Sequence, residues 1–138
     1  MSRILVIVLL FSLPISAQAG LMVNISMIYK NGIDKNLVLE SELHSIEEVW
    51  GKRKIQLTMK NGARLNLRAG FWERPVAQLE QVGPSSKIFL EGELFKPNGE
   101  LAKQIERRQT QVEIGEPFII GYKGQSQLLE VTIKPYLE

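Results

Sequence analysis

Carboxylates are the reactive groups that this chain offers in number, because the other residue types that carry catalysis are scarce. His44 is the only histidine, Asp34 is the only aspartate, and cysteine is absent. Glu91 and Glu93 stand two residues apart, so on one face of a β-strand they would lie about 7 Å from each other, a spacing compatible with two-carboxylate glycoside hydrolysis. Alternating glutamates on a half-exposed strand also serve solubility. A small secreted hydrolase that uses glutamates is therefore an alternative, and we favour a protein without enzymatic activity.

The same scarcity argues against most other reaction classes. A zinc site needs three or four His, Cys or carboxylate ligands, and a Ser-His-acid triad would have to use His44 without any nucleophile-elbow sequence. The chain contains neither of the glycine-rich loops that bind nucleotide phosphates, and a single aspartate cannot furnish an EF-hand calcium loop. We therefore expect no catalytic residue, metal ion or cofactor.

Two adjacent aromatic residues, Phe71 and Trp72, form the first candidate for recognition. They follow Gly70 and precede a Glu-Arg-Pro segment that contains Arg74. At least one of the two side chains should point away from the local core. Exposed aromatic residues beside arginine are typical of binding hot spots, although such a pair more often folds back over the end of a sandwich. We assign Phe71, Trp72 and Arg74 to a candidate binding site.

A cationic strand face is the second candidate. In a hairpin predicted over residues 54–69, the side chains of Lys54, Arg64 and Arg68 fall on the outer face. Lys54 and Arg68 would face each other across the hairpin and repel unless a carboxylate lies opposite them. Glu40 or Glu42 on a neighbouring strand could supply it. Lys54, Arg64 and Arg68 join the candidate site, with a solvated and internally balanced surface as the simpler interpretation.

The hairpin that positions these cations has a register that its sequence specifies. A two-residue loop at 61–62 would place apolar and polar groups on the same face. A three-residue loop at 60–62 instead keeps the apolar residues together and leaves Gly62 for the left-handed position of the turn. The expected inner pairs are Met59 with Ala63, Leu57 with Leu65 and Ile55 with Leu67.

Period-two alternation extends through most of the remaining chain and indicates antiparallel β-structure. We expect strands at 23–30 and 87–95 and a hairpin that pairs 118–122 with 129–133 across a loop at 124–127. The architecture predicted is an all-β, antiparallel Greek-key β-sandwich of immunoglobulin-like type with seven or eight strands.

Other elements are predicted from weaker patterns. Asn31-Gly32 should turn the chain, after which Leu37, Leu39 and Leu43 should point inward. Residues 44–50 fit a single helical turn or a bulged crossover, and residues 101–108 fit a strand better than a short helix. Residues 70–86 read as a long connection with a helical turn at 75–81, and residues 97–99 read as a tight turn.

The first nineteen residues have the pattern of an export signal. Arg3 supplies the positive start, an apolar run covers residues 4–13, and Ala17-Gln18-Ala19 offers a small-residue cleavage site. We expect cleavage after Ala19, leaving residues 20–138 as one domain. The apolar run is too short to span a bilayer, so we expect a mature chain without a membrane span in the periplasm or outside the cell.

Net charge and composition limit the class of partner that the protein can bind. Without Arg3 the 17 Lys and Arg residues become 16, against 15 Asp and Glu, so the net charge falls from +2 to +1 and offers no field for nucleic acid. The sequence therefore predicts an exported, non-enzymatic binding or accessory module of a bacterial envelope or secretion assembly, with another protein as its partner. Besides the hydrolase, a fibre subunit that adds its C-terminal strand, 128–135, to another chain is an alternative.

Overall fold

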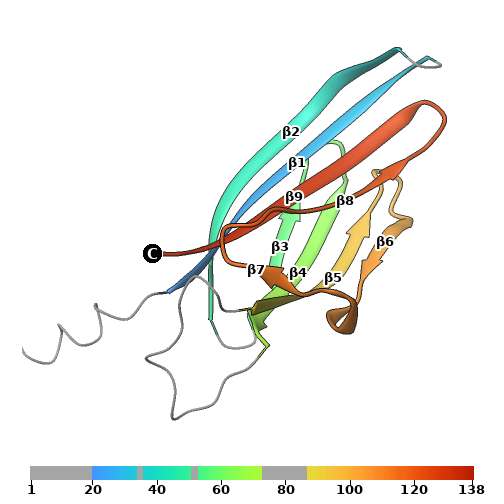
Figure 1. The fold of residues 1–138 in the computed structure, drawn as a ribbon. Coiled ribbons are helices and arrows are strands. Elements are labelled where there is room, and N and C mark those ends of the chain that lie inside the picture. Colours follow the sequence, from blue (N-terminus) through green and yellow to red (C-terminus); the bar gives the residue numbers. More distant parts are fainter. Residues whose placement is uncertain (1–19, 34–35, 51–52, 73–86) are drawn as a thin grey trace, which may run out of the picture.

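The computed structural model describes residues 20–33, 36–50, 53–72 and 87–138, and in this part of the chain the regular structure is almost entirely β (Figure 1). The predicted signal peptide, residues 1–19, and the helical turn predicted at 75–81 lie outside the described residues. The elements are β1 (Leu21–Ile33), β2 (Asn36–Val49), β3 (Ile55–Thr58), β4 (Arg64–Phe71), β5 (Lys87–Phe95), β6 (Leu101–Ile105), the 3-10 turn η2 (Arg107–Gln109), β7 (Val112–Glu113), β8 (Phe118–Lys123) and β9 (Gln127–Leu137).

Two antiparallel sheets form a sandwich. The first has the order β2-β1-β9-β8, and the second has the order β3-β4-β5-β6, with β7 pairing with β5 beyond the end of β6. The sheets lie as stacked layers, and the far ends of β1 and β2 reach past the ends of β3 and β4 (Figure 1). The predicted all-β sandwich is thus confirmed at the level of two antiparallel layers, with nine described strands where seven or eight were expected.

The core lies between the layers and follows from alternation along the strands. Val23, Ile25 and Met27 of β1 are fully buried, as are Val131 and Ile133 of β9. They meet the inward residues of the second sheet, whose largest fully buried members are Leu65, Leu67, Ile88, Leu90 and Leu94. Apolar burial of this kind is the dominant favourable contribution to folding. The chain contains no cysteine, so no disulfide adds to it.

Both hairpins whose register the sequence specified are confirmed. In the first, Ile55 pairs with Leu67 and Leu57 with Leu65. The Met59 amide donates to the Ala63 carbonyl at 2.7 Å, and Gly62 has φ of 99°. In the second hairpin, Phe118 pairs with Ile133, Ile120 with Val131 and Tyr122 with Leu129. The tight turn at 97–99 also forms, with Gly99 at φ of 92°.

The β1–β2 hairpin differs from expectation at its turn. Asn31 and Gly32 do not turn the chain; they lie in β1 and pair with Val38 and Leu37. A register shift follows Tyr29, which pairs with Ser41, whereas Lys30 pairs with Leu39. An extra residue in one strand reverses the alternation beyond it. Leu39 therefore does not point inward and is 47% exposed, whereas Leu43 packs against the core as predicted.

Residues 44–50 hold neither a helical turn nor a crossover. β2 continues to Val49 and pairs with β1 throughout, because β1 offers an uninterrupted partner as far as Leu21. Residues 101–105 form the strand that we favoured, and 107–109 turn as η2. Within the described residues, no helix is long and apolar enough to cross a membrane.

Candidate functional site

The outer face of the second sheet carries a ladder of complementary side chains between β4 and β5. Successive cross-strand pairs join Arg64 with Phe95, Asn66 with Glu93, Arg68 with Glu91 and Gly70 with Phe89. Each pair has a physical basis. The Arg64 guanidinium lies 4.6 Å from the centre of the Phe95 ring, the Asn66 amide donates to the Glu93 carboxylate at 3.4 Å, and Arg68 Nε donates to Glu91 Oε2 at 2.7 Å.

Phe89 occupies the centre of an arginine and aromatic cluster on this face. Its ring lies over Gly70, where an added Cβ would meet the ring at 2.8 Å, so the absence of a side chain makes room for it. The guanidinium of Arg107 lies 3.8 Å from the Phe89 ring centre, and that of Arg68 lies 5.9 Å from it. Phe89 is 7% exposed although it is on the solvent side of the sheet, because these side chains cover it. Cation–π contacts of this kind position guanidinium groups while leaving their edges free to donate.

Trp72 completes the cluster at the end of β4. Its ring meets Phe89 edge-on, with 5.9 Å between centroids, and the Arg107 guanidinium lies 5.7 Å from it. The indole N–H donates to the Thr110 carbonyl at 2.8 Å. Trp72 is therefore half-buried and fixed on the sheet rather than free in solvent.

Thr110 explains why Arg107 reaches this position. β6 pairs with one part of β5 and β7 with another, and between them no described strand pairs with the backbone of Leu90 on that side. The Thr110 hydroxyl makes the hydrogen bonds that a neighbouring strand would make at Leu90. It accepts from the Leu90 N–H at 2.8 Å and lies 2.9 Å from the Leu90 carbonyl, to which it can donate. The Thr110 amide also bonds to the Arg107 carbonyl at 3.2 Å, which ties η2 to the sheet.

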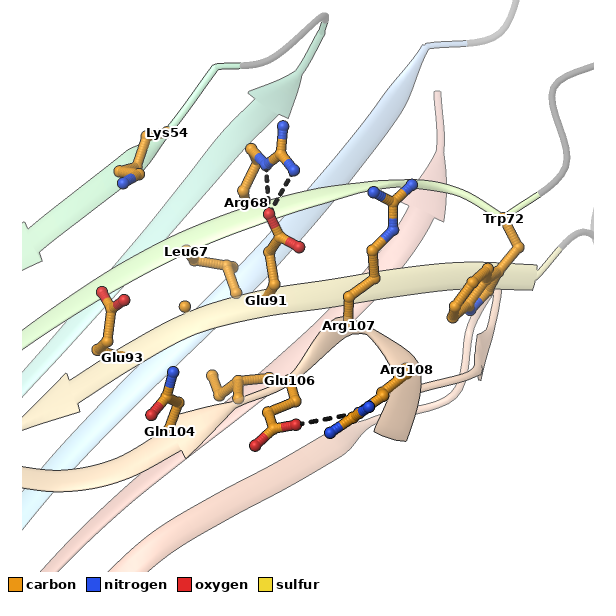
Figure 2. A pocket seen from close by; sticks show the side chains of 12 residues that line it. Lys54, Leu67, Arg68, Trp72, Glu91, Glu93, Gln104, Glu106, Arg107 and Arg108 are labelled. Atoms are coloured by element: carbon orange, nitrogen blue, oxygen red, sulfur yellow. Dashed lines mark hydrogen bonds and ion pairs between the residues drawn. The ribbon is translucent and has the colours of Figure 1, made fainter.

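A depression of about 570 Å³ opens beside this cluster (Figure 2). Figure 2 shows Arg68 and Glu91 turned toward each other, with Arg107 between them and Trp72 and with Glu106 joined to Arg108. The charged residues that line the depression are Lys54, Arg68, Arg107 and Arg108, together with Glu91, Glu93 and Glu106.

The charges of the depression are only partly balanced. Arg68 pairs with Glu91, and Arg108 pairs with Glu106 at 3.3 Å. Within the described part of the chain, no carboxylate lies within 4 Å of Lys54 or Arg107. Both are exposed. The depression therefore presents cations to solvent beside an aromatic cluster.

The residues predicted for binding separate into three groups. Lys54, Arg68 and Trp72 line the depression, and Arg64 lies on the same sheet face over Phe95. Phe71 points the other way and packs against the core, so only one of the adjacent aromatics is on the outer face, as alternation requires. Arg74 lies outside the described residues.

The sequence interpretation was wrong about the carboxylate that balances Arg68. Glu40 and Glu42 lie on β2 in the other sheet, and the partner is Glu91 on β5. Sequence reasoning also missed Arg107 and Thr110. An arginine pair at 107–108 was visible as a charge run, but no local pattern indicates that Thr110 fills a gap beside β5.

Glu91 and Glu93 do share a face, as predicted, and each has a partner on β4. Glu91 pairs with Arg68, and Glu93 accepts a hydrogen bond from the Asn66 amide. Among the described residues, no group of three or more His, Cys, Asp and Glu side chains is arranged to hold a metal ion.

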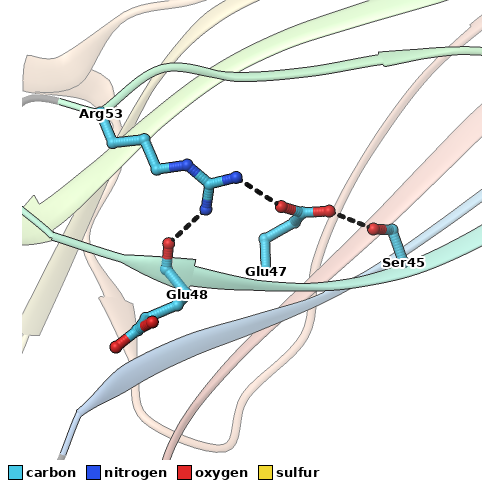
Figure 3. Close-up of polar contacts among 4 residues, drawn as sticks. All are labelled: Ser45, Glu47, Glu48 and Arg53. Carbon is cyan, nitrogen blue, oxygen red and sulfur yellow. Dashed lines mark hydrogen bonds and ion pairs between the residues drawn. The ribbon is translucent and has the colours of Figure 1, made fainter.

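A second charged cluster lies at the end of β2, on its inward side (Figure 3). Arg53 donates to Glu47 Oε1 at 2.8 Å and to the Glu48 backbone carbonyl at 2.6 Å, and the Ser45 hydroxyl donates to the other Glu47 oxygen. The pKa of Glu47 lies below its ordinary value, first because of the Ser45 hydrogen bond and then because of Arg53, while partial burial opposes the shift.

Comparison with known proteins gives no match: no protein-family model, no curated protein and no solved structure is similar to this chain at a significant level.

Proposed function

We propose that this protein is an exported, non-enzymatic recognition module that binds a partner protein through the outer face of its second sheet. The observation that carries the proposal is the Phe89 cluster with its exposed Arg107 at the edge of the depression. Arginine and aromatic residues dominate the binding energy of protein interfaces, because they combine apolar area with directed hydrogen bonds.

The charge of the depression favours an acidic segment of the partner. Lys54 and Arg107 would pair with its carboxylates, and Glu93 and Gln104 would accept or donate hydrogen bonds at the opposite wall. Arg107 stacked on Phe89 has already lost part of its side-chain freedom, so less entropy is lost on binding than for a free arginine.

Export belongs to the same proposal. The apolar run and small-residue site of residues 1–19 support export to the periplasm or the medium, where the protein would act in a bacterial envelope or secretion assembly. The strand pairing gives no support to the immunoglobulin-like Greek-key order, because apart from β1 with β9 and β5 with β7 the paired strands are consecutive in the chain. A fibre subunit that donates residues 128–135 is less well supported, because β9 has β1 on one side and β8 on the other.

The test is affinity capture with the tagged, signal-processed protein from its native envelope and medium, followed by native mass spectrometry. We expect a stoichiometric partner with the wild-type protein and its loss with the Lys54→Ala, Arg107→Ala double variant. Neither side chain has an ion pair with a described residue, so the loss of the Arg107 contact with Phe89 should lower the melting temperature only slightly.

Lys123→Ala is the matched control. Lys123 is an exposed cation on β8 in the other sheet, so its removal changes the net charge but not the proposed site. Equal capture by the double variant and the wild type would contradict the proposal, and so would a partner lost equally with Lys123→Ala.

A further inference from the structure

β2 is an edge strand with one side unoccupied by any described strand. It pairs with β1 on one side, and the order of its sheet begins with it. Its fourteen residues span roughly 45 Å at the usual rise of an antiparallel strand. Such an edge presents a row of backbone donors and acceptors that another extended chain can pair with.

The side chains of β2 are acidic and partly apolar. The strand carries four glutamates, Glu40, Glu42, Glu47 and Glu48, and no lysine or arginine. Its partner β1 has a single charged residue, Lys30. Within the described residues, only Glu47 of the four has a cation within 4 Å. Val38 and Ile46 are 66% and 61% exposed.

The two ends of this edge differ from its middle. Toward one end, the register shift after Tyr29 interrupts regular pairing. Toward the other end, Arg53 bonds to the Glu48 carbonyl and to Glu47. Between them, from Ser41 to Ile46, the strand pairs regularly with β1 and has no interruption. Proteins protect edges with bulges and inward-pointing charges, and here both devices lie outside that middle segment.

We propose that the segment Ser41–Ile46 of β2 is a second binding site, which takes an extended, lysine- or arginine-bearing segment of a partner protein as an added antiparallel strand. The outward side chains of this segment are Glu42, His44 and Ile46, since these pair with the outward residues of β1. An added strand would place a basic residue beside Glu42 and an apolar residue beside Ile46, because cross-strand neighbours on one face interact directly.

Charge selects a basic partner over a second copy of this chain. Two β2 strands placed side by side would bring four carboxylates of each copy together, and like charges across a sheet are destabilising. A strand that carries a basic and an apolar residue four positions apart, and so on one face, meets the charge of Glu42 and covers Ile46. This site is on the other sheet from the Phe89 cluster and does not depend on it.

The probe is a synthetic lysine–valine peptide with capped ends, in which lysine and valine stand four residues apart and so share one face of an extended strand. It is titrated into the signal-processed protein at low salt. We expect saturable binding and amide hydrogen-exchange protection confined to β2, at alternate residues of Ser41–Ile46, because only alternate amides point to the free edge. A glutamate–valine peptide should not bind. A lysine–proline peptide of equal charge should not protect β2, because proline lacks the N–H that a ladder needs.

The variant Glu42→Lys reverses the one acidic charge of the segment without touching the core. It should weaken the lysine–valine peptide about tenfold and allow the glutamate–valine peptide to bind. Binding of partner or peptide at the Phe89 cluster is a separate result, which the Lys54→Ala, Arg107→Ala variant detects.

Three results would overturn the proposal. One is equal binding by the lysine–valine and lysine–proline peptides, which would show charge attraction without strand pairing. Another is protection of β8 or β3 in place of β2. The third is a concentration-dependent dimer of the unliganded protein that protects the same β2 amides, which would make a second copy the occupant.

Discussion

The outer face of the second sheet and the unpaired edge of β2 differ in whether their charged side chains have partners. On the face, Arg68 has Glu91 and Arg64 has Phe95, so most charged groups meet a partner in register. On the edge, Glu42 and Glu48 share one sign and have no cation within 4 Å among the described residues. A residue inside a sheet has neighbours on both sides that can compensate it, whereas an edge residue has one.

This difference shows where a partner could contribute. The face is already assembled and, among the described residues, leaves Lys54 and Arg107 of the depression without a carboxylate, so it would accept a ligand as a preformed site. Within the part of the chain that the structure describes, the β2 edge has neither a second strand beside it nor a cation near Glu42 and Glu48, so a single basic strand would supply both. The face should therefore be sensitive to changes in packing, and the edge should be sensitive to changes in charge.

The largest effect on the free energy of unfolding is expected from Gly92→Ala, which disrupts the close packing of β5 against β4. Gly92 has φ of 155°, and an added Cβ would lie 1.9 Å from the Asn66 carbonyl oxygen. We expect a loss of about 3 kcal/mol or more in the free energy of unfolding, measured by chemical denaturation. Gly99→Ala is the control, since Gly99 has φ of 92° but no atom within 4 Å of the new Cβ, and it should cost only about 1 kcal/mol. Equal costs would show that the close approach of β4 to β5 is not what requires Gly92.

The variant Thr110→Val tests whether the hydroxyl completes β5 and holds Arg107. Valine keeps the shape but leaves the Leu90 N–H and carbonyl without the Thr110 partner, which should cost about 2 kcal/mol. Partner capture should weaken as well, because η2 would lose its attachment beside the Phe89 cluster. Thr110→Ser retains the hydroxyl and should preserve both stability and capture. Wild-type stability in Thr110→Val would refute the role of the hydroxyl.

The smallest effect is expected at the protected end of β2, from Glu47→Gln. The folded pKa of Glu47 is lowered, so its carboxylate contributes stability above its ordinary pKa, and this contribution is lost as the pH falls through the folded pKa. At neutral pH the variant should lose about 0.5 to 1 kcal/mol, since the ion pair is partly exposed. Denaturation curves of wild type and variant should converge in acid.

Glu48→Gln is the matched control for this change. Arg53 uses only the backbone carbonyl of Glu48, so its side chain can be neutralised without loss of the cluster. We expect wild-type stability from Glu48→Gln. The stability deficit of Glu47→Gln could instead persist undiminished at a pH below the range in which carboxylates titrate. That result would show that the charge of Glu47 is not what Arg53 and Ser45 stabilise.

Much of the fold could be predicted because its hairpins are local. The pairing of Ile55 with Leu67 and of Phe118 with Ile133 followed from keeping apolar residues on one face across a short loop. The same reasoning failed beyond Tyr29. The pattern of Leu37, Leu39 and Leu43 fits unbroken alternation, and the register shift that exposes Leu39 leaves no sign in the strand itself.

The candidate site was predictable only as separate parts. Alternation correctly placed Lys54, Arg64 and Arg68 on the outer face. The sequence also predicted that at least one of Phe71 and Trp72 points away from the core, and this residue is Trp72. Alternation does not indicate which strands lie side by side, so Glu91 was not recognised as the partner of Arg68. Arg107 reaches Phe89 because Thr110 bonds to the backbone of Leu90. These two residues are twenty positions apart in the chain.

Apart from the segment of β2 before its register shift, the amino-acid sequence by itself determined which side chains face the core and how the two short-loop hairpins pair, because these depend on alternation and on residues close together in the chain. Only the tertiary structure decided that β4 lies beside β5, that Thr110 fills the gap at Leu90, and that β2 remains at an edge. The physical reason is that a strand can pair with any other strand of suitable pattern. The choice among them is made by the packing of two whole sheets against each other, which no local segment encodes.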